Sequence, residues 1–280
     1  MQAMIITAYK DYAALRRCVG ALSRYTLCFV HVDAKSAITR EQVRELDAMD
    51  NVRAIKKRRV NWGSIEHLLA LLDLCRMALR DPRVTHLHLI SAQDFPTLPH
   101  AQFEALFDGD TRVHMEMQRL CEHPELDHRY RHFHAMHWIN YRDPDDRVQT
   151  LVGRIDRFQD MLRVRRRLNL AYKGFVWLSL PREAARYALE ERRCRRLLRR
   201  LRWTYIPEEF FFQNALADAG FEIEDNNMHY SLWDEPERGL PALLDEADLP
   251  RIDASGCVFA RKVDVGTPLY EALERRWLAP

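Results

Sequence analysis

The sequence predicts an α/β fold in which a mostly parallel sheet is flanked by helices. Over roughly the first hundred residues, short apolar runs typical of buried strands alternate with segments whose apolar residues recur at helical spacing. The chain has 280 residues, 47% of them hydrophobic, which is enough for one large core. Because no repeat, low-complexity segment or linker interrupts it, we expect a single domain over 1–280 with two halves, 1–118 and 119–280.

The first half is expected to supply the parallel strands. Helical patterns separate its apolar runs; Thr39 and Gln42 stand at capping-box spacing, and Ser64 precedes a helix that ends before Pro82. Ligands collect at the carboxyl ends of parallel strands, so polar residues at those ends are candidates for a binding site. The strand candidates cover 3–9, 26–33, 51–57 and 85–91.

The second half is expected to cover the sheet and complete it. The stretch 120–170 is rich in His, Arg and Tyr and predicts helices and loops. Beyond it, Pro181 stands near the start of one long helix and Gly220 closes another. The expected elements are a strand over 174–180, helices over 181–203 and 207–220, extended pieces within 221–233 and 255–264, and a terminal helix over 267–278.

The charge balance gives no reason to expect nucleic-acid binding, because 43 basic residues face 41 acidic ones. Nearly all basic residues are Arg, concentrated in 163–167 and 192–203. Codon bias explains this skew most simply. A second interpretation is a cationic helix face that contacts an anionic membrane. A third is a solvated face partly paired with Glu190 and Glu191.

The six cysteines form no CxxC pair and no zinc-finger spacing, so a reducing compartment is expected. The sequence also lacks an apolar run of about 18 residues, which excludes a membrane span, and its N-terminus does not have the pattern of a signal peptide. These features predict a cytoplasmic protein, either free or peripheral on the inner face of the cytoplasmic membrane.

The familiar phosphate and metal motifs are missing. Neither GxGxxG nor GxxxxGK[ST] occurs. The one Asp-x-Asp, at 108–110, follows a helical segment and is typical of a turn. His132, His134 and His137 do not have metal-ligand spacing, and a hydrogen-bonded His group is the simpler interpretation. We therefore expect no metal and no other cofactor, and any bound diphosphate must be held by protein cations.

Two segments could supply the chemistry of such a site. Arg261 and Lys262 follow an apolar strand candidate and could neutralise a leaving diphosphate, or they could simply be a basic strand end in water. Glu208 and Glu209 lie in the first turn of a helix beside three Phe residues. That position suits either a general base or plain helix capping.

Segments along nearly the whole chain, taken together, resemble the core-2/I-branching family of glycosyltransferases. The match includes a His-Val-Asp-x-Lys-Ser motif, a Trp-Gly helix, a Gln-Asp-Phe-Pro segment, a Pro-Asp-Glu segment and a closing Phe-Ala-Arg-Lys motif. Here these read HVDAKS, WGSIEH, QDFP, PEE and FARK. The matching segments are 4–17, 29–36, 60–79, 86–96, 173–189, 207–216 and 258–264.

The resemblance implies a GT-A-type fold and an inverting, metal-independent transfer of a sugar from a UDP-sugar. The acceptor would be a hydroxyl of a glycan or a lipid-linked saccharide. The catalytic base of the family falls on Glu209, and its diphosphate-binding Lys falls on Lys262, which Arg261 would assist. The first half would then bind the nucleotide, and the second half would bind the acceptor and carry out catalysis.

Further site residues follow from the same alignment of motifs. His31 and Asp33 would contact the nucleoside. Three residues at a helix start would line the same crevice, namely Trp62, Gly63 and Ser64. Contacts to the sugar or acceptor are expected from Gln93, Asp94, Glu116, Trp177 and Trp233.

Departures from the family pattern sharpen the expectation. His229 stands where many relatives have a diphosphate-binding Arg, so it would act in its charged form, or Arg238 or Arg251 would reach in, or donor binding would be weaker. Val176 replaces the acid of xylosyl-transferring relatives, which favours N-acetylglucosamine over the alternative donor, UDP-xylose. The chain resembles a bacterial member that builds a surface polysaccharide or lipooligosaccharide. A non-catalytic, Arg-rich protein that binds anionic surfaces is the alternative from another class.

Overall fold

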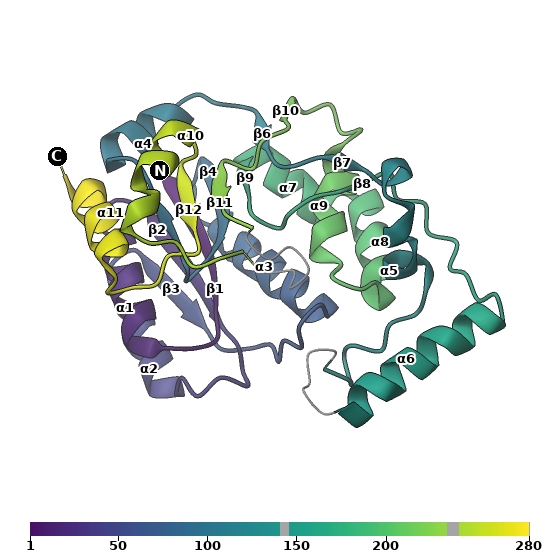
Figure 1. Cartoon of the computed structure of the whole chain (residues 1–280). Coiled ribbons are helices and arrows are strands. Elements are labelled where there is room, and N and C mark those ends of the chain that lie inside the picture. The colour runs from purple at the N-terminus through teal and green to yellow at the C-terminus, as the bar shows by residue number, and fades with distance from the viewer. Residues whose placement is uncertain (141–145, 234–240, 280) are drawn as a thin grey trace.

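The computed structural model describes residues 1–140, 146–233 and 241–279, and within them a seven-stranded sheet lies between two layers of helices (Figure 1). Along the sheet the strand order is β10-β6-β9-β4-β1-β2-β3. The strands are β1 (Gln2–Ala8), β2 (Leu27–Val32), β3 (Val52–Ile55), β4 (His86–Ser91), β6 (Val113–His114), β9 (Leu178–Pro181) and β10 (Ile223–Glu224).

The sheet is mostly parallel, as predicted. β1 pairs in parallel with both β2 and β4, and β2 pairs in parallel with β3. β9 is the exception, since it runs antiparallel between β4 and β6. The second half of the chain therefore inserts strands into the sheet that the first half begins, and the two halves share one sheet.

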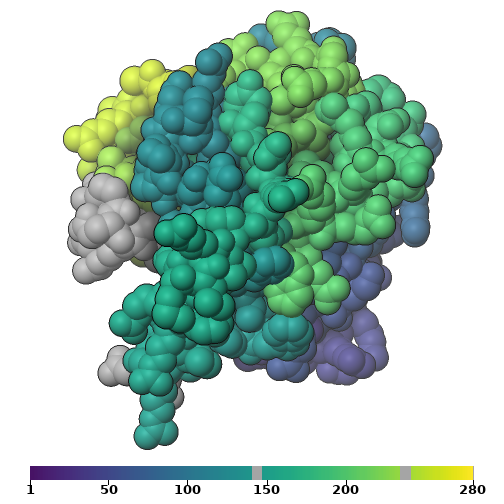
Figure 2. All heavy atoms as spheres, turned by 90° about the vertical axis from the view of Figure 1, so that its right-hand side faces the viewer, coloured from purple at the N-terminus to yellow at the C-terminus, as the bar shows by residue number. Residues whose placement is uncertain are grey.

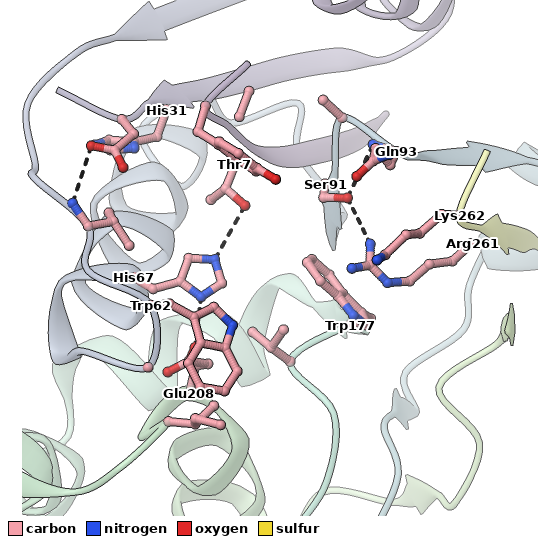
Figure 3. Close-up of a pocket in the computed structure, with 18 of the residues that line it drawn as sticks. Thr7, His31, Trp62, His67, Ser91, Gln93, Trp177, Glu208, Arg261 and Lys262 are labelled. Atoms are coloured by element: carbon pink, nitrogen blue, oxygen red, sulfur yellow. Dashed lines mark hydrogen bonds and ion pairs between the residues drawn. The ribbon is translucent and has the colours of Figure 1, made fainter. Parts of the chain in front are cut away.

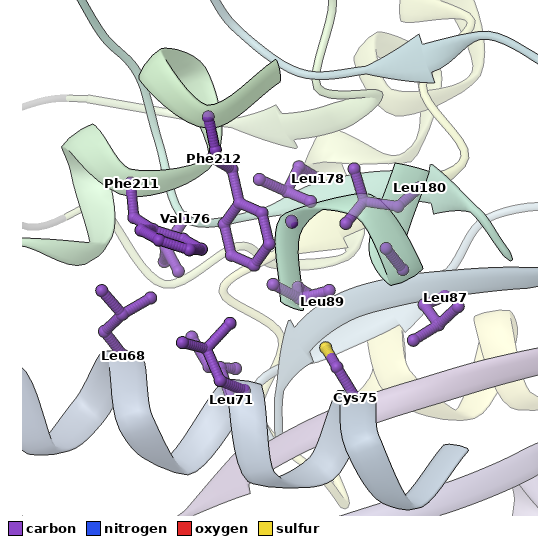
Figure 4. Close-up of a cluster of buried hydrophobic side chains, with 14 of the residues drawn as sticks. Leu68, Leu71, Cys75, Leu87, Leu89, Val176, Leu178, Leu180, Phe211 and Phe212 are labelled. Carbon is purple, nitrogen blue, oxygen red and sulfur yellow. The ribbon is translucent and has the colours of Figure 1, made fainter. Parts of the chain in front are cut away.

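Helices bury both faces of this sheet, which explains why its strands are apolar without alternation. On one face, Leu68 and Leu71 of α3 meet Phe211 and Phe212 of α9 above the central strands (Figure 4). The other face packs against α1, α4 and α11. The helices are α1 (Tyr12–Leu22), α2 (Arg40–Asp47), α3 (Ile65–Ala78), α4 (His100–Phe107), α5 (Asp127–Arg131), α6 (Asp146–Met161), α7 (Arg182–Glu190), α8 (Arg192–Arg200), α9 (Glu208–Leu216), α10 (Leu249–Ser255) and α11 (Pro268–Leu278), with short 3-10 turns at Leu120–Glu122, Pro124–Leu126, Leu201–Trp203 and Glu246–Asp248.

A second, three-stranded sheet brings the end of the chain back to the end of β4. Its order is β11-β12-β5, formed by His229–Ser231, Phe259–Arg261 and Asp94–Pro96. β12 runs antiparallel to β5, and this register places Arg261 opposite Asp94. A two-stranded sheet joins β7 (Gln118–Arg119) to β8 (Tyr172–Lys173).

Several local predictions are confirmed. Thr39 and Gln42 form the expected capping box at the start of α2. Ser64 is the N-cap residue of α3, although its side chain makes no capping bond. The Asp108–Asp110 segment is a turn, in which Gly109 has φ 72° and the Asp110 carboxylate accepts hydrogen bonds from Arg112 and His114.

Other local predictions are wrong, and tertiary packing explains each difference. The long helix predicted over 181–203 is interrupted at Glu191, whose backbone is extended, so that α7 and α8 each bury a different face. The predicted strand over 174–180 is shortened to β9, because backbone groups before it bond outside the sheet: the Gly174 N–H donates to the Glu209 carbonyl, and the Phe175 carbonyl accepts from Gln213. The helix predicted over 207–220 ends at Leu216, and Gly220 takes a left-handed conformation beyond it.

Candidate active site

A cavity of about 660 Å³ opens at the carboxyl ends of β1, β2 and β4 (Figure 3). This size suits a nucleotide sugar, since small-molecule sites commonly span about 300–1,000 Å³. Thr7, His31 and Ser91 line it from these strand ends, and the starts of α3 and α9 and the end of β12 form its walls. Figure 3 shows the carboxylate of Glu208 and the cations Arg261 and Lys262 as parts of one site.

His31 and Asp33, the residues predicted to contact the nucleoside, both line the cavity. The Nε2 atom of His31 accepts a hydrogen bond of 3.1 Å from the backbone N–H of Arg58. Burial lowers the pKa of His31 to about 4, so the ring is neutral near pH 7. Asp33 Oδ1 accepts hydrogen bonds from the backbone N–H groups of Lys35, at 2.8 Å, and Val60, at 3.3 Å. Both side chains thus fix the loops that border the cavity.

Trp62 and Gly63 also line the cavity, at the start of α3. Gly63 has φ 74°, and a Cβ there would lie 2.5 Å from Met136, so glycine is required by both conformation and space. Its carbonyl accepts a 2.9 Å hydrogen bond from the backbone N–H of Ile206, which ties α3 to the loop before α9. Ser64 is buried and lies outside the cavity lining.

Glu209 lies at the cavity in the first turn of α9. Its Oε2 atom accepts a 2.8 Å hydrogen bond from Arg129, and the ammonium of Lys173 is 3.9 Å away. The Arg129 guanidinium is itself buried over the rings of Tyr205 and Phe210. The Glu209 carboxylate is thus held by one arginine, with a lysine nearby, at the N-terminus of a helix.

Glu208 also lines the cavity but has different partners. Its Oε1 atom lies 2.9 Å from Nδ1 of His67, and Nε2 of that histidine lies 3.3 Å from the Thr7 hydroxyl (Figure 3). Its Oε2 atom is buried and has no hydrogen-bond partner among the described residues. The two adjacent carboxylates are thus held by separate networks, one through a histidine and one through an arginine.

The cationic wall is formed by the end of β12. Nη1 of Arg261 donates to Ser91 Oγ at 2.8 Å and to Asp94 Oδ1 at 2.7 Å. The guanidinium carbon also lies 4.0 Å from the centre of the Trp177 ring, a cation–π contact. Lys262 follows Arg261 on the same side of the cavity (Figure 3).

The predicted sugar and acceptor residues separate into two groups. Gln93, Trp177 and Trp233 line the cavity; Gln93 donates to Asp264 at 2.6 Å, and Trp233 stacks on Phe175. Asp94 and Glu116 do not line it. Asp94 is fully buried and orients Arg261, so its contact is to the cation rather than to a sugar. Glu116 accepts a hydrogen bond from Gln118, and burial raises the pKa of its carboxyl group.

His229, predicted to contact the diphosphate, lies outside the cavity lining. Its ring stacks on Phe259, Nδ1 donates to the carbonyl of Asn227 at 2.7 Å, and burial lowers the pKa of the imidazole. A neutral ring in this place cannot replace an arginine cation. Of the other two candidates, Arg251 is exposed on α10 beside Asp248, and Arg238 lies outside the described residues.

The sequence did not point to Thr7, His67, Arg129 or Lys173. Thr7 and His67 stand within a strand and a helix pattern, where no local signal distinguishes them from structural residues. Arg129 lies within the segment 120–170, which was predicted only as helices and loops, and Lys173 follows that segment. Their common partner, Glu209, is 80 and 36 residues away in sequence, and only the folded chain brings them together.

Within the described ranges, no three His, Cys, Asp or Glu side chains are grouped so that they could hold a metal ion. His132 and His134 are buried near Asp156, where they belong to the packing of α6. In the same ranges no helix is both long and apolar enough to cross a bilayer.

Comparison with known proteins adds the family. The sequence model described as Core-2/I-Branching enzyme matches residues 3–252. The chain belongs to the Core-2/I-branching enzyme family. The expected family is confirmed, and with it the expected class of enzyme, a glycosyltransferase. The matched range of this Core-2/I-branching enzyme includes the carboxylate pair and ends before Arg261 and Lys262. No curated protein matches the chain.

Among solved structures, partial likenesses are to Staphylococcus aureus TarS. The structure of TarS 1–349 in complex with UDP-GlcNAc has 11% identity and a TM-score of 0.31, over 42% of this chain and 35% of that one. A second TarS structure has 13% identity and a TM-score of 0.30, over 42% of this chain and 22% of that one. The chain thus matches about a third or less of the length of these structures.

Proposed function

We propose that this Core-2/I-branching enzyme transfers a sugar, N-acetylglucosamine in the first instance, from a UDP-sugar to an acceptor hydroxyl with inversion and without a metal. The observation that carries the proposal is one cavity with a carboxylate pair on α9 and a cationic pair, Arg261 and Lys262, on β12. Transfer to a hydroxyl needs a base for the proton and a positive group for the leaving diphosphate, and this cavity offers both.

In this mechanism Glu209 accepts the proton of the acceptor hydroxyl as its oxygen attacks the anomeric carbon in line. The new bond to the acceptor oxygen forms while the bond to the phosphate oxygen breaks, and UDP leaves with the electron pair. Lys262 and Arg261 stabilise the negative charge of the diphosphate. Both side-chain hydrogen bonds that Arg261 makes within the described residues use Nη1, so its Nε and Nη2 atoms remain for a ligand.

We assign the remaining residues by their positions around the cavity. His31 and Asp33 hold the loops beside the nucleoside, and Trp62 and Gly63 border the phosphates. Gln93, Trp177 and Trp233 face the transferred sugar or the acceptor. An apolar side chain, Val176, also lines the cavity. It supports N-acetylglucosamine over xylose as the donor sugar, and a glycan or lipid-linked saccharide remains the proposed acceptor.

The test is UDP release from UDP-N-acetylglucosamine and UDP-xylose in EDTA, with an acceptor panel. We expect faster release from UDP-N-acetylglucosamine and a loss in kcat of about 10²- to 10⁴-fold in Glu209→Gln, because the proton then has no acceptor. The matched control is Glu183→Gln, an exposed residue of α7, which should retain full activity.

A binding measurement separates the base from the cationic wall. UDP should stabilise Glu209→Gln as it does the wild type, by about 2.7 kcal/mol at a hundredfold excess over Kd. It should stabilise Lys262→Met much less. Full turnover by Glu209→Gln would overturn the base assignment. Activity that is lost in EDTA and restored by manganese would overturn the proposal that no metal is needed. If the protein neither turned over a UDP-sugar nor was stabilised by UDP, the assignment of a UDP-sugar as the donor would be overturned.

A further inference from the structure

An exposed apolar surface lies around α6, in a part of the molecule that the proposed mechanism does not use. We define the α6 patch as six exposed side chains, three on α6 and three on the segments beside it: Leu151, Phe158 and Met161, with Phe133, Trp138 and Leu162. Trp138 is 71% exposed and Met161 is 69% exposed. α6 projects from the body of the molecule (Figures 1 and 2). Exposed apolar side chains gathered on one projecting element are typical of an interaction surface.

The helical spacing explains why these side chains share a surface. Leu151, Ile155, Phe158 and Leu162 recur at intervals of three and four residues, which places them on one stripe of α6. α6 is anchored to the body of the protein by Gln159, which lies one turn from Ile155 and beside the stripe. Its amide exchanges hydrogen bonds with the backbone of Phe133 at 2.7 and 3.1 Å. The fold therefore fixes α6 with its apolar stripe turned outward.

The same contact makes the patch continuous beyond the helix. Phe133, held by Gln159, lies 6.4 Å from the ring of Trp203, and Trp203 lies 5.5 Å from Trp138. Arg166 and Arg202 cover the rings of Phe133 and Trp203 at 5.4 and 5.9 Å. Aromatic rings beside arginines are the side chains that favour the boundary between water and lipid.

The positive charge around α6 indicates what the patch binds. Residues 147–167 contain seven Arg and two Asp. A second copy of this chain placed face to face would bring two such cationic surfaces together, and their repulsion opposes that pairing. An anionic bilayer offers apolar chains to the stripe and negative headgroups to the arginines. We infer that the α6 patch docks this protein on anionic lipid membranes, with the axis of α6 in the plane of the interface.

The structure also separates this surface from α8, the other arginine-rich segment. The Arg residues of α8 are exposed, but its Leu197 and Leu198 pack against the core, and none of its described side chains is an exposed large hydrophobic residue. α8 thus carries charge without an apolar stripe. Insertion at an interface requires both, so α6 rather than α8 is the docking element.

The test is co-sedimentation of the full chain with vesicles of phosphatidylcholine alone and of phosphatidylcholine mixed with phosphatidylglycerol. We expect binding to the anionic vesicles only, weakened by salt. Leu162→Ser should reduce the partition coefficient about tenfold, since a leucine then no longer enters the apolar layer. Leu106→Ser, an exposed leucine of α4 outside the patch, should leave it unchanged.

Two variants that each remove one positive charge complete the experiment. Arg154→Gln, beside the stripe on α6, should weaken binding about fivefold, and Arg196→Gln on α8 should not. Turnover on a water-soluble acceptor should be the same in all four variants, which keeps this inference independent of the proposed function. Equal binding of Leu162→Ser and the wild type would overturn it. So would no vesicle binding combined with a dimer in gel filtration that Leu162→Ser disrupts, which would assign the patch to a second copy.

Discussion

The strand ends of the first half and the walls built by the second half form the same cavity in different ways. At the strand ends, His31 and Asp33 are held by backbone N–H groups within 27 residues of them. At the walls, Glu208 and Arg261 are held by side chains of His67 and Asp94, which are 141 and 167 residues away. The first region depends on local structure, and the second depends on contacts between the halves.

This difference shows why the two halves cannot be treated as separable modules. Two pairs that hold side chains of the cavity, His67–Glu208 and Asp94–Arg261, cross from one half to the other. Breaking a pair of this kind is therefore expected to affect folding and catalysis together. Changes at the strand ends should instead appear mainly in the dependence of stability on pH.

The largest effect on stability is expected from the pair Asp94–Arg261. Asp94 has no exposed side-chain surface and Arg261 has 12%. Asp94→Asn leaves a nearly buried cation without its counter-charge, which should lower the free energy of unfolding by about 3–5 kcal/mol, as measured by urea denaturation. Asp253→Asn, which breaks the exposed pair with Arg276, should cost at most about 1 kcal/mol. Equal losses in the two variants would contradict the distinction between crossing and surface pairs.

A slightly smaller effect is expected from His31 in acid. Because burial lowers the pKa of His31 from 6.5 to about 4, the unfolded chain takes up a proton between these values while the folded chain does not. The contribution of His31 to stability is therefore complete above pH 6.5 and is lost as the pH falls toward 4, by up to about 3 kcal/mol.

Unfolding curves at a series of pH values for the wild type and His31→Gln measure this contribution. The variant should lose less stability between pH 6.5 and 4, since glutamine can accept the bond from the Arg58 N–H without titrating. The exposed His123→Gln is the control and should follow the wild type. If the free energy of unfolding fell equally with pH in the wild type and in His31→Gln, His31 would not contribute to the loss of stability in acid.

The smallest effect is expected from His67. His67→Leu removes the one hydrogen-bond partner of the buried Glu208 carboxylate within the described chain, which should cost about 1–3 kcal/mol of stability. The double variant His67→Leu/Glu208→Leu should recover part of this loss, because the buried carboxylate that lost its partner is then also removed. A double-mutant cycle with no coupling between the two positions would show that the contact does not orient Glu208.

The sequence predicted the fold where residues determine structure locally. Apolar runs with both faces buried gave the parallel strands, and the cap at Thr39 and the turn at Gly109 followed from their own short segments. It failed where distant contacts decide, as at Glu191, where two helices replace one, and at Gly174, whose N–H bonds to the Glu209 carbonyl rather than to a neighbouring strand. Local propensity contains no information on either contact.

The candidate site shows the same division. Of the fourteen residues that the motifs assigned to the site, ten line the cavity, and Ser64, Asp94, Glu116 and His229 do not. The motifs succeeded mostly where they stand at the end of a strand or the start of a helix. They could not distinguish Asp94, which is buried and pairs with Arg261, from Gln93, which lines the cavity. Nor could they reveal that Arg129 and His67 hold the two carboxylates, since such partnerships are properties of the folded chain.

The long separation in sequence between β5 and β12 has a consequence for biosynthesis. During translation, β1 to β4 leave the ribosome long before residues 259–261 are made, so that β5 has an unpaired edge and Asp94 lacks its counter-ion during this interval. α11 is made still later, and its buried Trp277 donates to the carbonyl of Ala21 in α1. The nascent protein therefore cannot form the cationic wall of its cavity until residues 259–262 have left the ribosome, and a chain terminated before them would keep Asp94 buried without a cation.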